Sequence, residues 1–205
     1  MSFVNTLKKN EKLKQFIHRL LIPKNQAKPR LWVKLFVNPF FHKRGKNSVV
    51  CRWTRMDVLP FNKFVLGNNS TIEDFSTINN GVGDVIIGNN TRIGLSNVVI
   101  GPVMIGDNVM FAQNILLSGL NHGFENPDIA PALQKISTAQ ITVENDVWIG
   151  GNVSVTAGVT IGKHSVIGAG SVITKSVPPY SVAVGNPARV IKKYNFESRQ
   201  WEKVQ

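Results

Sequence analysis

The chain has 205 residues, 42% of them apolar, with one cysteine and a formal net charge of +12 at neutral pH. This length allows one ordinary domain with a modest appendage. The single cysteine, Cys51, excludes an internal disulfide and favours a reducing compartment. No run approaches the roughly 20 apolar residues of a membrane-spanning helix, and lysines stand near the N-terminus where a signal peptide would be apolar. We therefore expect a cytoplasmic protein.

The positive charge is concentrated in residues 1–63, which hold 15 Lys and Arg against two acids, a net charge of +13, whereas residues 64–205 hold 9 against 10, a net charge of −1. Pro23 and Pro29 should end or break any helix in the basic segment. Its apolar residues recur at close to helical spacing and include Phe3, Leu7, Leu13, Phe16, Ile17, Leu20 and Leu21. The sequence predicts a partly helical N-terminal arm over residues 1–63.

Three uses of this arm stay open at this point. Its apolar side can dock on the main domain and leave the lysines in water. It can also lie on an anionic membrane surface, which would place the protein at the periphery of the inner membrane. Cations interleaved with aromatic residues can bind nucleic acid, but no nucleic-acid motif accompanies them, and we expect no nucleic-acid partner.

From residue 64 to residue 184 the chain follows a six-residue repeat. A helix repeats near 3.6 residues and a strand near 2, so a period of six indicates a chain wound as a prism with one large inward residue per flat side. Three sides make one coil, and the repeats suffice for about five coils stacked by parallel strand pairing. The repeated positions are Leu66, Ile72, Ile78, Ile87, Ile93, Val99, Ile105, Phe111, Leu117, Val143, Ile149, Val155, Ile161, Ile167 and Ile173.

Two segments depart from the repeat. Residues 118–140 interrupt it, which predicts a loop extruded from the prism surface. After the prolines of "SVPPY", the repeat stops because proline removes ladder donors. We expect residues 185–205 to form a tail with a short helix.

The repeat, together with "NHGF" and "VGNPARVIKK", resembles the hexapeptide-repeat acetyltransferases. The similarity is strongest over residues 143–193, to the maltose and galactoside O-acetyltransferase branch, and extends to O-acetyltransferases of capsule and exopolysaccharide clusters. The resemblance implies an all-β fold, a left-handed parallel β-helix, with a homotrimeric assembly. It further implies transfer of acetyl from acetyl-CoA to a hydroxyl of a sugar or saccharide.

Within this resemblance His122 occupies the position of the catalytic histidine. Transfer to a hydroxyl needs a base with a pKa near neutrality, which suits imidazole. Gly151 matches the residue whose backbone N–H holds the oxyanion. Asp57, Asp84 and Glu125 are candidates to orient the base. The coenzyme A contacts implied by the family are Gly151, Ala169, Thr174, Lys175, Arg189 and Lys192.

The acetyl acceptor needs polar contacts near the base. Asn79, Asn80, Asp84, Asn97 and Asn121 qualify by residue type, although asparagine is also favoured at tight corners because it tolerates left-handed backbone angles. The histidines are too dispersed for a three-histidine zinc site, and we expect no metal. N-acetylation of an amino sugar or small amine, and a non-catalytic solenoid scaffold, remain alternatives.

Overall fold

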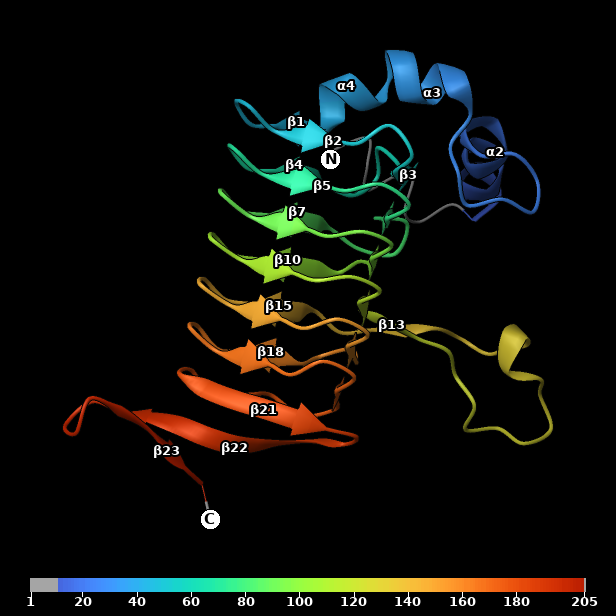
Figure 1. Ribbon diagram of the computed structural model, residues 1–205. Coiled ribbons are helices and arrows are strands. Elements are labelled where there is room, and N and C mark those ends of the chain that lie inside the picture. The colour runs from blue at the N-terminus through green and yellow to red at the C-terminus, as the bar shows by residue number, and fades with distance from the viewer. Residues whose placement is uncertain (1–10, 205) are drawn as a thin grey trace, which may run out of the picture.

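The computed structural model describes residues 11–204, which wind into a parallel β-solenoid with three flat faces (Figure 1). Each coil adds one short strand to each face. Face A consists of β1 (Lys43–Arg44), β4 (Phe64–Leu66), β7 (Val85–Ile87), β10 (Val103–Ile105), β15 (Ile141–Val143) and β18 (Thr160–Ile161). Face B consists of β2 (Val49–Val50), β5 (Thr71–Ile72), β8 (Arg92–Ile93), β11 (Met110–Phe111), β16 (Trp148–Ile149), β19 (Val166–Ile167) and β21 (Ser181–Gly185), extended by β22 (Ala188–Asn195) and β23 (Gln200–Lys203). Face C consists of β3 (Arg55–Asp57), β6 (Thr77–Asn79), β9 (Val98–Ile100), β12 (Leu116–Ser118), β17 (Ser154–Val155) and β20 (Val172–Ile173).

The solenoid begins earlier than the sequence predicted. Faces A and C each hold six strands, so the described chain forms six coils instead of about five. The additional coil, β1 to β3, lies at residues 43–57, and the predicted boundary at residue 64 is therefore wrong. Its inward positions Arg44, Val50 and Met56 keep the six-residue spacing and pair in register with the next coil. Arg44 obscured the repeat because it is exposed at the end of the column, where an apolar residue is not required.

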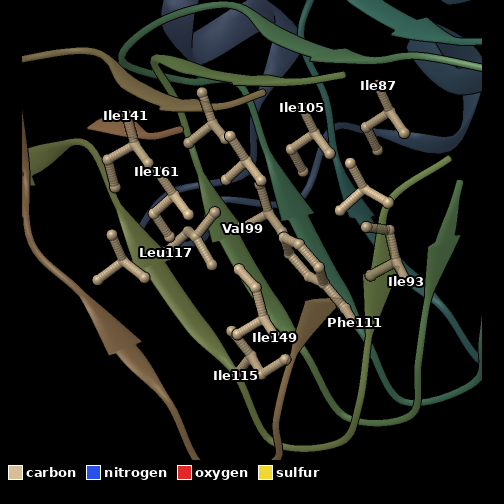
Figure 2. Packing of buried hydrophobic residues seen from close by; sticks show 14 of the residues in the cluster. Ile87, Ile93, Val99, Ile105, Phe111, Ile115, Leu117, Ile141, Ile149 and Ile161 are labelled. Carbon is tan, nitrogen blue, oxygen red and sulfur yellow. The ribbon is translucent and has the colours of Figure 1, made fainter. Parts of the chain in front are cut away.

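The fifteen repeated apolar positions form the interior, and each is at most 4% exposed. Figure 2 shows Ile87, Ile105 and Ile161 among the side chains that fill this interior. Burying each such side chain contributes about 1.5–3 kcal/mol. Since side chains fill the column from end to end, any chemistry must take place on the outer surface.

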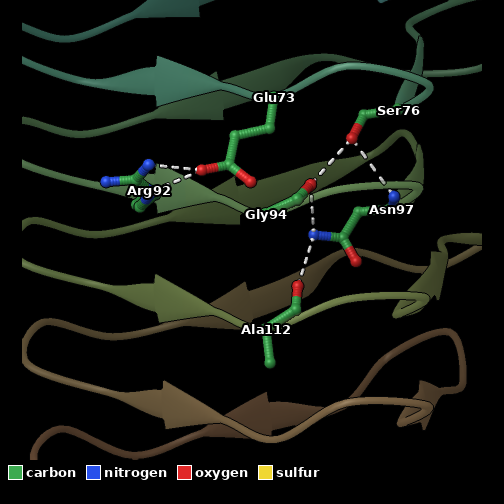
Figure 3. Close-up of polar contacts among 6 residues, drawn as sticks. All are labelled: Glu73, Ser76, Arg92, Gly94, Asn97 and Ala112. Carbon is green, nitrogen blue, oxygen red and sulfur yellow. Dashed lines mark hydrogen bonds and ion pairs between the residues drawn. The ribbon is translucent and has the colours of Figure 1, made fainter.

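Buried polar side chains link successive coils. The Asn97 Nδ2 donates to the carbonyl oxygens of Gly94 and Ala112, each at 2.9 Å (Figure 3). The Ser76 Oγ donates to the same Gly94 oxygen and accepts from the Asn97 N–H. These bonds satisfy backbone groups that the corners leave unpaired, and Glu73 and Arg92 add an ion pair on the outside.

Two of the three corners are fixed by single residues with left-handed backbone angles. At the corner between faces A and B these are Asn47, Asn69, Asn90, Asn108, Asp146, His164 and Tyr180. At the corner between faces B and C they are Phe75, Ser96, Asn114, Asn152 and Gly170. The third corner, from face C to face A, varies in length from Gly101–Pro102 to the whole of 119–140. This third edge, named here the C–A corner, accommodates the insertions.

Helices α3 (Leu31–Phe36) and α4 (Asn38–Phe41) lie over the N-terminal end of the column, and α2 (Glu11–Leu21) lies beside its first coils (Figure 1). The partly helical arm is thus confirmed, although Phe3 and Leu7 of its apolar pattern lie outside the described residues. Leu21, Ile22, Val33 and Leu59 form a small second core, so the arm docks on the solenoid. Among residues 11–204, no helix is both long and apolar enough to cross a membrane.

The predicted C-terminal helix is wrong. Residues 188–203 form the antiparallel strands β22 and β23, which continue face B beyond β21. Tyr194 packs edge-on against both Phe196 and Trp201, with ring centroids 5.1 and 5.5 Å apart. The open strand edge of β21 and these cross-strand aromatic pairs override the local helical preference.

Candidate active site

The C–A corner brings together residues that are distant in sequence. Asp57, Asn79, Ile100 and Ser118 succeed one another in register at the ends of β3, β6, β9 and β12. On the other side of Ser118, β12 pairs with β17 and β17 with β20, which ends immediately before Thr174. At about 4.8 Å per strand, Asn79 and Thr174 each lie about 10 Å from Ser118, on opposite sides of it.

The loop at 119–140 leaves the column next to Ser118. Its two limbs pair as antiparallel strands β13 (Leu120–Asn121) and β14 (Ser137–Thr138), and a short 3-10 helix, η1 (Pro131–Leu133), lies at its far part (Figure 1). Gln134 links the limbs, because its side-chain Nε2 donates to the carbonyls of Asn126 and Ile129 at 2.8 and 2.7 Å. The loop is therefore held together by its own hydrogen bonds and projects away from the column; it is named here the His122 arm, as distinct from the N-terminal arm.

His122 directly follows β13 on this arm and is exposed. Within the described residues its imidazole makes no hydrogen bond, so its two nitrogens are accessible to a ligand. The structure thus places the predicted base outside the column, at the root side of the arm. Both Asn79 and Thr174 lie at the same C–A corner.

None of the three carboxylates predicted to orient the base bonds to His122 within the described residues. Asp57 is buried and pairs with the Arg55 guanidinium at 2.9 Å. Asp84 accepts from the Lys63 N–H at 2.8 Å. Glu125 accepts from the backbone of its own loop, and the hydrogen bonds from the N–H groups of Glu125 and Phe124 lower the pKa of its carboxyl.

Gly151 and Ala169 stack at the corner between faces B and C. The Gly170 N–H donates to the Gly151 carbonyl at 2.8 Å, whereas the Gly151 N–H has no partner within residues 11–204. A side-chain carbon added at Gly151 would make a close contact of 3.3 Å with the Gln113 carbonyl oxygen. An unpaired backbone donor is what an oxyanion requires.

The predicted cofactor residues divide between the two edges of face C. Gly151 and Ala169 lie on the edge next to face B, and Arg189 pairs with Val184 at the same edge below them. Thr174 and Lys175 lie on the C–A corner. Lys192 is farther from both edges, opposite Val182 in the middle of face B.

The predicted acceptor residues separate into exposed and buried sets. Asn121 is exposed beside His122, and Asp84 is half-buried at the C–A corner. Asn80 and Asn97 are fully buried and hydrogen-bonded to backbone, so their assignment as sugar contacts is wrong. The reason is that a carboxamide can satisfy several backbone groups inside a corner at once. Neither these two nor Asn79 or Asn121 has the left-handed backbone seen at other asparagine corners.

Asn79 borders a surface cavity that the sequence did not predict. The cavity, of about 390 Å³, lies between the N-terminal arm and the C–A corner. Its lining includes His18, Arg19, Lys24 and Leu59. The first three of these are some 60 positions from Asn79 in the chain, and the docking of the N-terminal arm on the solenoid brings them together. Among residues 11–204, no three His, Cys, Asp or Glu side chains cluster so as to hold a metal ion.

Two family models match the solenoid. "Bacterial transferase hexapeptide (six repeats)" matches residues 140–175, and "Hexapeptide repeat of succinyl-transferase" matches residues 84–117. Solved structures about a fifth identical to this chain share its fold, and several of them hold coenzyme A. These matches agree with the coils seen here.

Two curated relatives that match part of this chain are named as O-acetyltransferases. A putative lipopolysaccharide biosynthesis O-acetyl transferase of Escherichia coli K12 is 36% identical over 50% of this chain and 56% of the relative. The galactoside O-acetyltransferase of the same organism is 44% identical over 48% of each chain. The chain therefore spans about half the length of these curated relatives.

A solved relative covers more of the chain. The structure of a maltose O-acetyltransferase from Clostridium difficile 630 is 28% identical, with a TM-score of 0.54, and covers 92% of this chain and 88% of that one. The repeat models cover the coils on either side of residues 118–139 and not that segment itself. The chain therefore contains hexapeptide repeats, and it is similar over part of its length to galactoside and maltose O-acetyltransferases.

Proposed function

We propose that the protein transfers an acetyl group from acetyl-CoA to a hydroxyl of a sugar or saccharide, with His122 as general base. The observation that carries this proposal is the position of His122. It is exposed on a braced arm whose root lies between Asn79 on one side and Thr174 on the other. The names of the relatives, which are galactoside and maltose O-acetyltransferases, support the acceptor class.

In the proposed reaction, an imidazole nitrogen of His122 takes the proton from the acceptor hydroxyl as that oxygen attacks the thioester carbonyl. In the homotrimer that we also propose, the N–H of Gly151 from an adjacent subunit donates to the carbonyl oxygen as negative charge develops there. The C–S bond then breaks, and the thiolate of coenzyme A receives the proton from His122. The products are the acetyl ester and free coenzyme A.

The donor would lie along face C and its edges. The Ala169 N–H can bind an amide carbonyl of the pantetheine arm, since it donates no hydrogen bond within the described chain. Thr174 and Lys175 border the other edge. Arg189 is exposed and can pair with phosphate, with Lys192 farther along β22.

We further propose a homotrimer, in which the arm of one subunit brings His122 to a neighbour's donor. The arm and the solenoid faces both expose large apolar side chains that a neighbour would cover. On the arm, Phe124 and Leu133 are 74% and 80% exposed; on the faces, Met110 and Trp148 are 56% and 50% exposed.

The acceptor would approach the same corner. Asn121 beside the base, Asn79 and Asp84 offer amide and carboxylate groups to sugar hydroxyls. The cavity next to Asn79 provides a surface on which the rest of a saccharide can rest.

The test is release of free thiol from acetyl-CoA over a panel of sugars and amino sugars, with three matched proteins: the wild type and two histidine variants. His122→Ala should lower the turnover number by roughly 100-fold or more. His164→Ala is the control, because His164 is also exposed but lies at the corner between faces A and B.

Equal activity of the wild type and His122→Ala would overturn the role of His122. Turnover with amino sugars alone would instead support N-acetylation. A wild type that neither binds coenzyme A nor turns over any acceptor would support a scaffold.

A further inference from the structure

Helices α3 and α4 present an unusual outer face at the N-terminal end of the column (Figure 1). Of their residues, only Val33 and Asn38 are buried. The large apolar side chains point to solvent, and Phe36 and Phe40 are 70% and 85% exposed. The outer face comprises Leu31, Trp32, Leu35, Phe36, Phe40 and Phe41. A surface helix normally shows the opposite arrangement, with apolar residues inward.

Contacts between the helices and the solenoid fix the orientation of this face. Val33 is fully buried in the small core with Leu21, Ile22 and Leu59. The buried Asn38 Nδ2 donates to the Val58 carbonyl oxygen at 2.9 Å. Both anchors lie on the inner side of the helices, so the aromatic residues are held outward by a packed contact with the solenoid.

Exposed cations flank α3 and α4 in the sequence, and Lys34 lies on α3 itself. No acidic residue occurs between Lys12 and Met56. Neither of the ion pairs found in the described chain, Arg55–Asp57 and Arg92–Glu73, involves them. The exposed cations are Lys24, Lys28, Arg30, Lys34, Lys43, Arg44 and Lys46. The face therefore combines aromatic side chains with a positive charge that the neighbouring protein surface does not neutralise.

We propose that the outer face of α3 and α4 rests on an anionic lipid bilayer. Phe and Trp side chains suit the boundary between headgroups and acyl chains, and Lys and Arg near an anionic surface contribute about 1 kcal/mol each. A second copy of this chain is a poorer occupant, because a two-fold contact through this face would oppose the same cations. The long axis of the solenoid would then point away from the bilayer. The 119–140 loop, which carries His122, would lie several coils from the membrane surface.

The experiment is cosedimentation of the full chain with vesicles of phosphatidylcholine alone and of phosphatidylcholine mixed with phosphatidylglycerol. The wild type should bind the anionic vesicles and not the neutral ones. The double variant Phe36→Ser, Phe40→Ser and the double variant Lys28→Gln, Lys34→Gln should each reduce partitioning roughly tenfold or more. Since all four side chains are exposed, both variants should fold, which circular dichroism checks.

Matched controls come from the opposite end of the column. Phe196→Ser removes an aromatic side chain that is 63% exposed, and Arg199→Gln with Lys203→Gln removes two exposed cations. These controls should bind anionic vesicles as the wild type does. The proposal is overturned if the wild type binds neutral vesicles equally well or binds neither kind of vesicle. It is overturned as well if the Phe36, Phe40 or the Lys28, Lys34 double variant binds anionic vesicles as the wild type does. It is also overturned if Phe36→Ser, Phe40→Ser dissociates an oligomer in light scattering, since the face is then a subunit contact.

Discussion

Asn80 holds the backbone of Leu59 at both polar groups. Its Oδ1 accepts from the Leu59 N–H at 2.7 Å, and its Nδ2 donates to the Leu59 carbonyl at 3.0 Å. A further bond from the same Nδ2 reaches the Asn62 carbonyl at 2.8 Å. One side chain therefore fastens the insertion after the first coil to the second coil.

Asn80→Ala should destabilise the fold by about 3 kcal/mol, because it leaves several buried backbone groups unpaired. Urea unfolding followed by circular dichroism measures the loss. Asn79→Ala is the matched control, since the Asn79 Oδ1 accepts only from the exposed Gly81 N–H, and it should cost less than about 1 kcal/mol. Equal losses in the two variants would contradict the role given to Asn80.

Gly67→Ala should destabilise the stack by about 2 kcal/mol or more, because a side-chain carbon at Gly67 would overlap the carbonyl of Gly88 in the next coil. Backbone atoms within a coil cannot move aside without changing the register. Thermal unfolding should show the loss. Gly151→Ala, whose added carbon would lie 3.3 Å from the Gln113 carbonyl oxygen, should lower the melting temperature much less than Gly67→Ala.

Arg189→Ala should raise the KM for acetyl-CoA by roughly threefold to tenfold and leave kcat little changed, because it removes an exposed pairing with a phosphate group far from the reacting atoms. Steady-state thiol release at varied acetyl-CoA measures the effect. Arg199→Ala, an exposed arginine at the turn between β22 and β23, should keep the wild-type KM. A change in kcat alone for Arg189→Ala would count against the assignment.

His42 should make the stability depend on pH. Burial lowers the pKa of its imidazole, both nitrogens lack partners within the described chain, and the ring lies edge-on to Phe64 at 6.0 Å. Since the folded pKa is below the unfolded value of about 6.5, the unfolded chain binds the extra proton. The contribution of neutral His42 to the free energy of unfolding is complete above about pH 6.5. It is lost as the pH falls from there through the folded pKa.

Urea midpoints at about pH 7.5 and about pH 5.5 test this behaviour. The midpoint should fall at the lower pH in the wild type and fall less in His42→Leu. The same drop in both proteins would assign the pH dependence to groups other than His42.

The sequence revealed the coils wherever one large residue per side is apolar, because that position is dictated by the packed interior. It failed at Arg44, an exposed residue of the first coil, where no further coil requires an apolar side chain. It also failed at the C-terminal hairpin, because pairing with β21 is a contact that local propensity cannot express.

The candidate site shows the same division. Motif and position in the repeat single out His122 and Gly151 as candidates, and their roles stay predictions. The burial of Asn97, by contrast, depends on which backbone groups a corner leaves unpaired. The grouping of His18 and Lys24 with Asn79 depends on how the N-terminal arm docks on the solenoid, and no local sequence pattern encodes that contact.

The C–A corner has a consequence for how such a protein can diversify. Two edges of the prism are tied to a single backbone geometry, so adding a residue there would shift every later side chain out of its place in the interior. The third edge absorbs segments of any length without disturbing the later coils. New recognition elements can therefore be grafted along that edge alone, and specificity for different acceptors can evolve while the column is inherited unchanged.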